Sequence, residues 1–222
     1  MKKIILPNSY QTNTRNDVIN FIISKKITRP TKILEIGGGA GHTTKILCEI
    51  FNCHGTNIDI KIPKIKAKGI DHLEMDMNSK NNSNKLTNKR FDLILALDVI
   101  EHIEDTDKLL DFIKSISSNN TYLFISLPNI KNIRVPFYIY FKNTFPRKNA
   151  GIFDKTHLRW FTKKDVIELI FKKGYQYVDS TYTDHKSRFI KNRLIEKIFG
   201  FLLAPQFIVC GQFKDDSDNR IN

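Results

Sequence analysis

Apolar residues follow two spacings along this chain, and the two spacings alternate. Runs of mostly apolar residues predict buried strands, whereas apolar residues three or four positions apart predict amphipathic helices. The predicted strands are residues 33–36, 55–59, 70–77, 91–97, 122–127, 175–182 and 207–213. The predicted helices are residues 8–30, the segment that carries Ile46, Leu47 and Ile50, and residues 105–116, 162–171 and 188–203.

This alternation predicts an α/β fold with a doubly wound, mostly parallel seven-stranded sheet and right-handed crossovers. Residues 91–97 are apolar at nearly every position, which is typical of a strand covered on both faces of a parallel sheet. No parallel-type crossover leads back to the sheet centre between the last two strands. We therefore expect these two strands to form an antiparallel hairpin at one edge.

The length of 222 residues fits a single domain, which we place at residues 1–214. Residues 130–160 follow the fifth strand as an insertion, and the polar residues 215–222 are predicted to be a disordered tail. Three scattered cysteines suit neither a disulfide framework nor a zinc site and fit a reducing cytoplasm. The apolar start before Pro7 is too short for a signal peptide, so we expect a cytoplasmic protein.

The net charge of +13 raises the question of nucleic-acid binding. Most basic residues are lysines spread along the chain, without a dense arginine-rich block, so a solvated surface is the favoured interpretation and nucleic acid is disfavoured. An anionic substrate or an anionic membrane surface remains open.

A glycine-rich stretch directly follows the first predicted strand. Gly37, Gly39 and Gly41 allow positive φ and close approach of a ligand, and they lead into a helix N-terminus. A dinucleotide fingerprint requires a sixth-position glycine, but His42 and Thr44 stand there.

The pattern from Glu35 to Gly41, acidic-x-Gly-x-Gly-x-Gly, resembles motif I of class I S-adenosylmethionine (SAM)-dependent methyltransferases. In that family the glycine loop lies under the amino-acid end and ribose of SAM. The cysteine common at one position of the motif in relatives is Gly38 here. The resemblance implies a Rossmann-like methyltransferase fold with its edge hairpin.

Each later strand ends in a residue that suits SAM, because ligands of α/β sheets bind beyond the carboxyl ends of the strands. Asp59 is assigned to the ribose hydroxyls, with a turn aspartate as the structural alternative. The resemblance assigns Asp76 to the adenine amino group and lets Met77 line the ring, with a loop-start aspartate as the alternative. The predicted cofactor-binding residues are Glu35, Gly37, Gly39, Gly41, Asp59, Asp76, Met77 and Leu97.

Two further segments extend the resemblance. Asp98-Val99-Ile100-Glu101-His102 is similar to the Asp/Glu-Val-x-Glu-His segment of a large methyltransferase subgroup, which includes quinone-biosynthesis O-methyltransferases. Residues 154–162 resemble the Asp-x-x-His-x-x-x-Phe-Thr segment of methyltransferases from cell-surface glycan gene clusters, whose insertion covers the substrate pocket. This makes His157 and His102 the candidates for a general base, because a neutral imidazole accepts a proton near pH 7. A structural role for His157 is the alternative.

A metal site is a second hypothesis for the same residues. Asp98, Glu101, His102 and His157 would hold Mg²⁺ or Mn²⁺, as the acidic-x-x-Glu-His segments of related O-methyltransferases and small-RNA 2′-O-methyltransferases imply. The favoured alternative is an acidic cluster at the start of a helix, where the helix dipole stabilises it.

The predicted function is SAM-dependent O-methylation of a small molecule or a glycan hydroxyl. The alternatives are an RNA 2′-O-methyltransferase and a non-catalytic, methyltransferase-like partner subunit. Residues 186–204 form a basic, amphipathic pattern. It predicts either a helix packed on the sheet, the favoured interpretation, or peripheral contact with the inner membrane face, which would suit a lipid-linked acceptor. The acceptor and the oligomeric state stay open.

Overall fold

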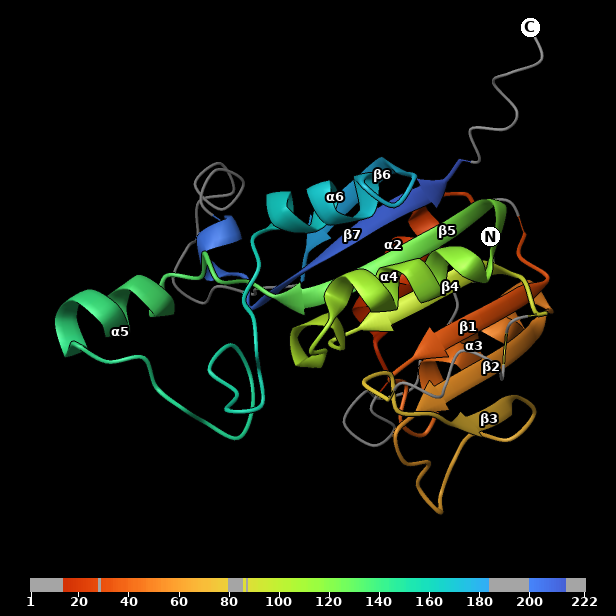
Figure 1. Ribbon diagram of the computed structural model, residues 1–222, viewed down its shortest axis with the longest axis horizontal. Helices are drawn as coiled ribbons and strands as arrows, with labels where there is room; N and C mark the ends of the chain where they lie inside the picture. Colours follow the sequence, from red (N-terminus) through yellow and green to blue (C-terminus); the bar gives the residue numbers. More distant parts are fainter. Residues whose placement is uncertain (1–13, 28, 80–85, 87, 184–199, 215–222) are drawn as a thin grey trace, which may run out of the picture.

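The computed structural model describes residues 14–27, 29–79, 86, 88–183 and 200–214 and contains one seven-stranded sheet (Figure 1). The strands lie in the order β3-β2-β1-β4-β5-β7-β6. β7 is antiparallel to both neighbours, and the other pairings are parallel, which confirms the predicted topology. The strands are β1 Lys32–Ile36, β2 His54–Asp59, β3 Asp71–Glu74, β4 Phe91–Leu97, β5 Ser117–Pro128, β6 Tyr175–Tyr182 and β7 Gln206–Phe213.

Helices cover both faces of this sheet. The helices are α2 Asn16–Ser24, α3 His42–Phe51, the 3₁₀ turn η2 Ile100–His102, α4 Thr106–Ser115, α5 Arg134–Lys142 and α6 Lys163–Phe171. The apolar sides of α2 and α3 share one core cluster with β1 and β4, while α4 and α6 pack in the cluster on the opposite face (Figure 1). The sheet is thus the middle of three layers, and the carboxyl ends of its parallel strands meet at one edge.

Most predicted elements are present, with shifts at their ends. β3 is shorter than the predicted strand 70–77. The capping box between Thr162 and Asp165 starts α6 as expected. Of the predicted helix 188–203, the structure describes only residues 200–203, which are helical, so the amphipathic segment lies outside the described residues for most of its length. The proposed tail 215–222 also lies outside them.

The insertion between β5 and α6 contains a helix that the sequence pattern did not predict. Pro136 stands in the first turn of α5, where its missing N–H costs no helical hydrogen bond. At the base of the insertion, Asn129 and Phe161 form a parallel bridge that holds the two ends together. The insertion is therefore a loop that leaves and rejoins the sheet edge at neighbouring points, and it carries His157. Among the described residues, no helix is long and apolar enough to cross a membrane.

Candidate functional site

The glycine loop joins the end of β1 to the first turn of α3. Gly37, Gly39 and Gly41 all have positive φ, and Gly41 is the N-cap residue of α3. The Gly37 N–H donates to the Ile58 carbonyl over 2.8 Å, which fixes the loop to β2. Backbone N–H groups at the start of α3 thus surround a cavity, as expected for a ligand-binding helix N-terminus.

Gly38, the departure from the cysteine of related motifs, has a steric reason here. A Cβ atom at this position would lie 2.2 Å from Oδ1 of Asn57. Asn57 in turn donates from Nδ2 to the Gly39 carbonyl over 2.8 Å. The asparagine on β2 therefore takes the space that a side chain at Gly38 would need.

Glu35 lies on β1 directly beneath this loop. Its Oε2 accepts a hydrogen bond of 3.1 Å from the Thr44 N–H and one of 2.5 Å from the Thr44 hydroxyl. Burial raises the pKa of Glu35 to about 7, although these two hydrogen bonds favour the ionised form. Glu35 both anchors the first turn of α3 and lines the cavity of the glycine loop.

Asp59, at the end of β2, is aimed back at the glycine loop. Its Oδ2 accepts a hydrogen bond of 2.7 Å from the Gly39 N–H. Asp59, Asp76 and Met77 line one cavity of about 230 Å³ beside the loop, together with the buried Met75. The structure thus brings the residues predicted for ribose and adenine to a single cavity.

The second cavity, of about 550 Å³, adjoins the glycine loop and shares Gly37 and Asp98 with the first. Glu35, Leu97 and the glycines, all predicted to bind the cofactor, line it, and so does Arg15, which the sequence did not single out. The Arg15 guanidinium contacts the Asp98 carboxylate at 2.6 Å and also donates to Ser126 over 2.9 Å. These contacts join positions 83 and 111 residues apart in sequence. No local spacing could have indicated them.

Asp98 stands apart from the metal-ligand group in which the sequence hypothesis placed it. Its φ of +56°, in the left-handed region, turns the chain at the end of β4. Besides Arg15, the carboxylate accepts a hydrogen bond of 2.8 Å from the side-chain amide of Gln206. Asp98 is consequently held in a polar network at the second cavity, whereas the next turn carries the other predicted ligands.

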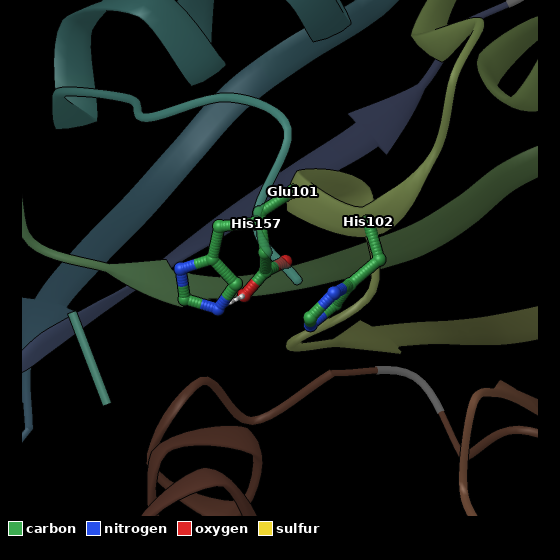
Figure 2. Close-up of side chains that lie close together, drawn as sticks. All are labelled: Glu101, His102 and His157. Atoms are coloured by element: carbon green, nitrogen blue, oxygen red, sulfur yellow. Dashed lines mark ion pairs between the residues drawn. The ribbon is translucent and has the colours of Figure 1, made fainter. Parts of the chain in front are cut away.

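Glu101, His102 and His157 form that separate group (Figure 2). One potential ligand atom from each lies within 4.8 Å of the other two, and Nε2 of His157 is 3.9 Å from Oε1 of Glu101. In Figure 2 a Glu101 carboxylate oxygen points toward the His157 ring, and the two imidazole rings are in edge-to-face contact with their centroids 4.8 Å apart. His102 also lines the 230 Å³ cavity, so the group borders the predicted adenine and ribose site.

Backbone contacts attach the insertion to this group. The Leu158 N–H donates to the Glu101 carbonyl over 2.8 Å, and Nδ1 of His102 lies 3.2 Å from the Thr156 carbonyl. The Arg159 guanidinium bonds the Glu104 carbonyl at 2.6 Å. His157 therefore reaches Glu101 because a loop far along the chain is fixed onto η2.

Three polar atoms of this group are buried and lack a hydrogen-bond partner among the described residues. Glu101 is 1% exposed, and within the described part of the chain neither of its carboxylate oxygens has a hydrogen-bond partner, nor does Nδ1 of the buried His157. Burial, with the charge of Asp98 adding to it, raises the pKa of Glu101 to about 8. Burial lowers the pKa of His157, and the neighbouring His102 contributes to this. At neutral pH His157 is thus a neutral imidazole able to accept a proton.

The family described as "Methyltransferase domain" matches residues 10–180. Ubiquinone biosynthesis O-methyltransferases from Pelagibacter ubique and Nitrobacter winogradskyi are similar, with 26% identity over 110 residues and 33% over 88 residues. These matches cover 48% and 36% of this chain and 45% and 32% of the relatives. The chain therefore spans less than half the length of these curated relatives.

Solved structures of similar fold span nearly the whole chain. A SAM-dependent methyltransferase from Archaeoglobus fulgidus superimposes with a TM-score of 0.63 at 17% identity, covering 92% of this chain and 97% of that one. The N-methyltransferase NodS from Bradyrhizobium japonicum, in complex with S-adenosylhomocysteine, gives a TM-score of 0.60 at 14% identity over 93% and 91%. At these identities the similarity concerns the fold.

Proposed function

The chain belongs to the methyltransferase-domain family, with the class I SAM-dependent methyltransferase fold, and from that premise we propose that it O-methylates a hydroxyl group of a small molecule or glycan. The observation that carries the choice of a hydroxyl is the group of Glu101, His102 and His157. A hydroxyl is a weak nucleophile until it loses its proton, so its methylation calls for a base beside the methyl donor. The similarity to quinone O-methyltransferases supports the same choice.

SAM would occupy the two cavities that adjoin the glycine loop. Asp59 would accept hydrogen bonds from the ribose hydroxyls, and Asp76 with Met77 would receive the adenine ring. Arg15 would pair with the carboxylate of the methionine moiety in the second cavity, while Asp98 and the buried Glu35 face its ammonium group. In this pose the sulfonium would lie near Gly37 and Asp98, which line both cavities.

His157 is the favoured base, since its pKa is lowered and its imidazole lies beside Glu101, whose carboxylate oxygens have no hydrogen-bond partner among the described residues. The acceptor oxygen attacks the methyl carbon, the bond from carbon to sulfur breaks, and S-adenosylhomocysteine leaves. His157 takes the hydroxyl proton during the attack. The insertion excludes water and aligns the acceptor, which supplies much of the acceleration in a direct displacement.

The same three residues fit a divalent cation. A buried carboxylate with no partner among the described residues is an expensive feature that a cation would compensate, and two imidazoles favour Mn²⁺ over Mg²⁺. Glu101, His102 and His157 would hold the ion. When bound, it would lower the pKa of an acceptor hydroxyl. Because the pKa of Glu101 is about 8, binding at pH 7 would release a proton, which calorimetry in buffers of different ionisation enthalpy measures.

Two measurements test the proposal in order. Calorimetry should give a micromolar-range Kd for SAM, about −8 kcal/mol. Asp59→Ala should weaken SAM more than tenfold, because ribose hydroxyls lose their acceptor. As a matched control, Asp71→Ala removes a carboxylate from the amino end of β3, away from both cavities.

Labelled SAM with a panel of catechols, glycans and short RNA then identifies the acceptor. We expect label on an oxygen of a small molecule or glycan. Label on nitrogen or on an RNA 2′-oxygen would contradict the proposed acceptor class, and absence of SAM binding would contradict the enzymatic function itself.

A further inference from the structure

Helix α5 of the insertion carries apolar side chains on two sides. Its inner side packs through Val135, which is 5% exposed, and Tyr138 against the loop residues Ile152 and Phe153. This packing accounts for the attachment of α5 to the rest of the insertion. The remaining apolar residues of the helix point elsewhere.

The outer face of α5 consists of Ile133, Phe137, Tyr140 and Phe141, which recur every three or four positions. Their exposed fractions run from 46% for Phe137 to 81% for Tyr140, and Phe141 is 77% exposed. Figure 1 shows α5 at one end of the molecule, away from the sheet. A contiguous aromatic face of this kind, left in water, marks an interaction site.

The charge around this face is of one sign. Between positions 129 and 153 the chain has five basic residues and no acidic one. Arg134 and Lys142, at the two ends of α5, are exposed, as are Arg147 and Lys148 in the loop that follows. An aromatic face with a cationic border is complementary to an anionic, partly apolar surface.

We propose that the outer face of α5 docks on an anionic lipid membrane. The helix would lie in the plane of the interface with Phe137 and Phe141 among the acyl chains, while the flanking basic residues contact lipid phosphates. Tyrosine is suited to this boundary because its ring is apolar and its hydroxyl is polar. This face belongs to a different stretch of the sequence from the basic pattern of residues 186–204.

The alternative anionic partner, single-stranded RNA, is less well matched. Bases stack on aromatic rings whose faces are open, but Phe137 and Phe141 stack on each other with centroids 5.6 Å apart. The exposed aliphatic side chains of Ile133 and Ile139 offer a base no stacking surface, whereas they suit lipid chains. The surface therefore favours the membrane.

Docking at α5 would place the acceptor side of the protein against the lipid. The same insertion carries α5 and His157, and the bridge between Asn129 and Phe161 fixes both relative to the sheet. An acceptor dissolved in or linked to the membrane would then reach the site from that side. This last consequence rests on the proposed O-methylation, but the docking itself does not.

The first test is co-sedimentation with phosphatidylcholine vesicles that contain about one quarter phosphatidylglycerol, and with phosphatidylcholine alone. We expect binding to the anionic vesicles and little to the neutral ones. The double variant Tyr140→Ser/Phe141→Ser should lower the partition coefficient tenfold or more, as loss of two inserted aromatic rings predicts. Phe171→Ser, a change at an equally exposed phenylalanine on α6, should leave it unchanged.

The second test concerns charge. Arg134→Glu/Lys142→Glu should reduce binding about tenfold or more at low ionic strength, and added salt should weaken wild-type binding. The control Lys89→Glu/Lys172→Glu makes the same change in net charge at exposed sites outside the insertion. If the control pair reduced binding equally, the net charge of the protein rather than α5 would account for the vesicle binding, and the proposal that α5 is the docking surface would be wrong.

Other outcomes overturn the proposal outright. No binding to anionic vesicles at low ionic strength, with SAM affinity intact, would remove the membrane as the partner and leave the methyltransferase assignment untouched. A wild type that sediments as a dimer, with a monomeric Tyr140→Ser/Phe141→Ser variant, would identify the face as a contact between two copies. Tight RNA binding lost in the same variant would identify RNA.

Discussion

The glycine loop and the Glu101–His157 group both contain buried polar residues near the carboxyl edge of the sheet. They differ in whether their carboxylates have hydrogen-bond partners. In the first, Glu35 is bonded by Thr44 and Asp59 by the Gly39 N–H. In the second, among the described residues, both Glu101 oxygens and Nδ1 of His157 lack a hydrogen-bond partner. The first region has an exception of its own, because Oδ1 of Asn57 is also buried without a partner among the described residues, but its two carboxylates are hydrogen-bonded whereas the Glu101 carboxylate is not.

The largest effect expected from this difference is on turnover at His157. His157→Ala should lower turnover about a hundredfold or more, the usual scale for loss of a general base, while SAM affinity changes less than about twofold. Single-turnover assays and calorimetry measure the two quantities. His54→Ala, at an exposed histidine on the opposite end of β2, is the control. Unchanged turnover in the His157 variant would make that residue structural and transfer the proposed role to His102.

An intermediate effect is expected at Arg15, which lines the cavity of the glycine loop. Arg15→Ala should weaken SAM binding about tenfold to a hundredfold through loss of a charge-assisted contact to the cofactor carboxylate. The variant also leaves Asp98 without its cation, so decarboxylated SAM serves as the comparison ligand. Its affinity should fall much less. An equal loss for both ligands would mean that Arg15 acts only by holding Asp98.

A further effect is on stability, and it depends on pH. The pKa of Glu101 is raised by burial to about 8 from an ordinary value of 4.5, so the folded state binds more protons than the unfolded state between these values. In the metal-free protein, stability should therefore fall as pH rises through this interval, by at most about 1.4 kcal/mol per pH unit from this group. Glu35, with a pKa of about 7, acts in the same direction over a narrower interval.

Glu101→Gln should remove the Glu101 part of this dependence. Urea unfolding at pH 5 and pH 8.5 should show the variant relatively more stable than the wild type at the higher pH. A wild type whose stability does not fall between the two values would show that Glu101 ionises freely in the folded protein. Saturating Mn²⁺ should stabilise the wild type more than the variant, because only the wild type has the Glu101 carboxylate. At pH 8.5 this should reduce the difference between their free energies of unfolding, and at pH 5, where Glu101 is protonated, the reduction should be smaller.

The sequence predicted the sheet well because its main strands carry a strong signal. Residues 91–97, for example, are apolar nearly throughout, and β4 has these bounds. The residues expected to bind the cofactor line shared cavities because the glycine loop and the aspartates follow the carboxyl ends of parallel strands, which meet at one edge of the sheet.

What the sequence could not predict depends on long-range contacts and on single dihedral angles. Arg15 meets Asp98 across 83 positions. Asp98 has a positive φ and is held by Arg15 and Gln206, so it does not join the group of Glu101, His102 and His157 although it is only three positions from Glu101 in sequence. Helix α5 was missed because its apolar residues lie on two sides of the helix, one packed and one exposed, which blurs the single apolar stripe of an ordinary amphipathic helix.

The bridge between Asn129 and Phe161 makes the insertion a replaceable module. Because its ends are pinned side by side, the closure entropy grows only slowly with the length of the intervening chain, and the sheet need not adjust to what that chain contains. The enclosed segment can diversify in length and composition while the methyl-donor site stays the same. Exchange of residues 130–160 between relatives should therefore transfer the choice of acceptor without unfolding the host.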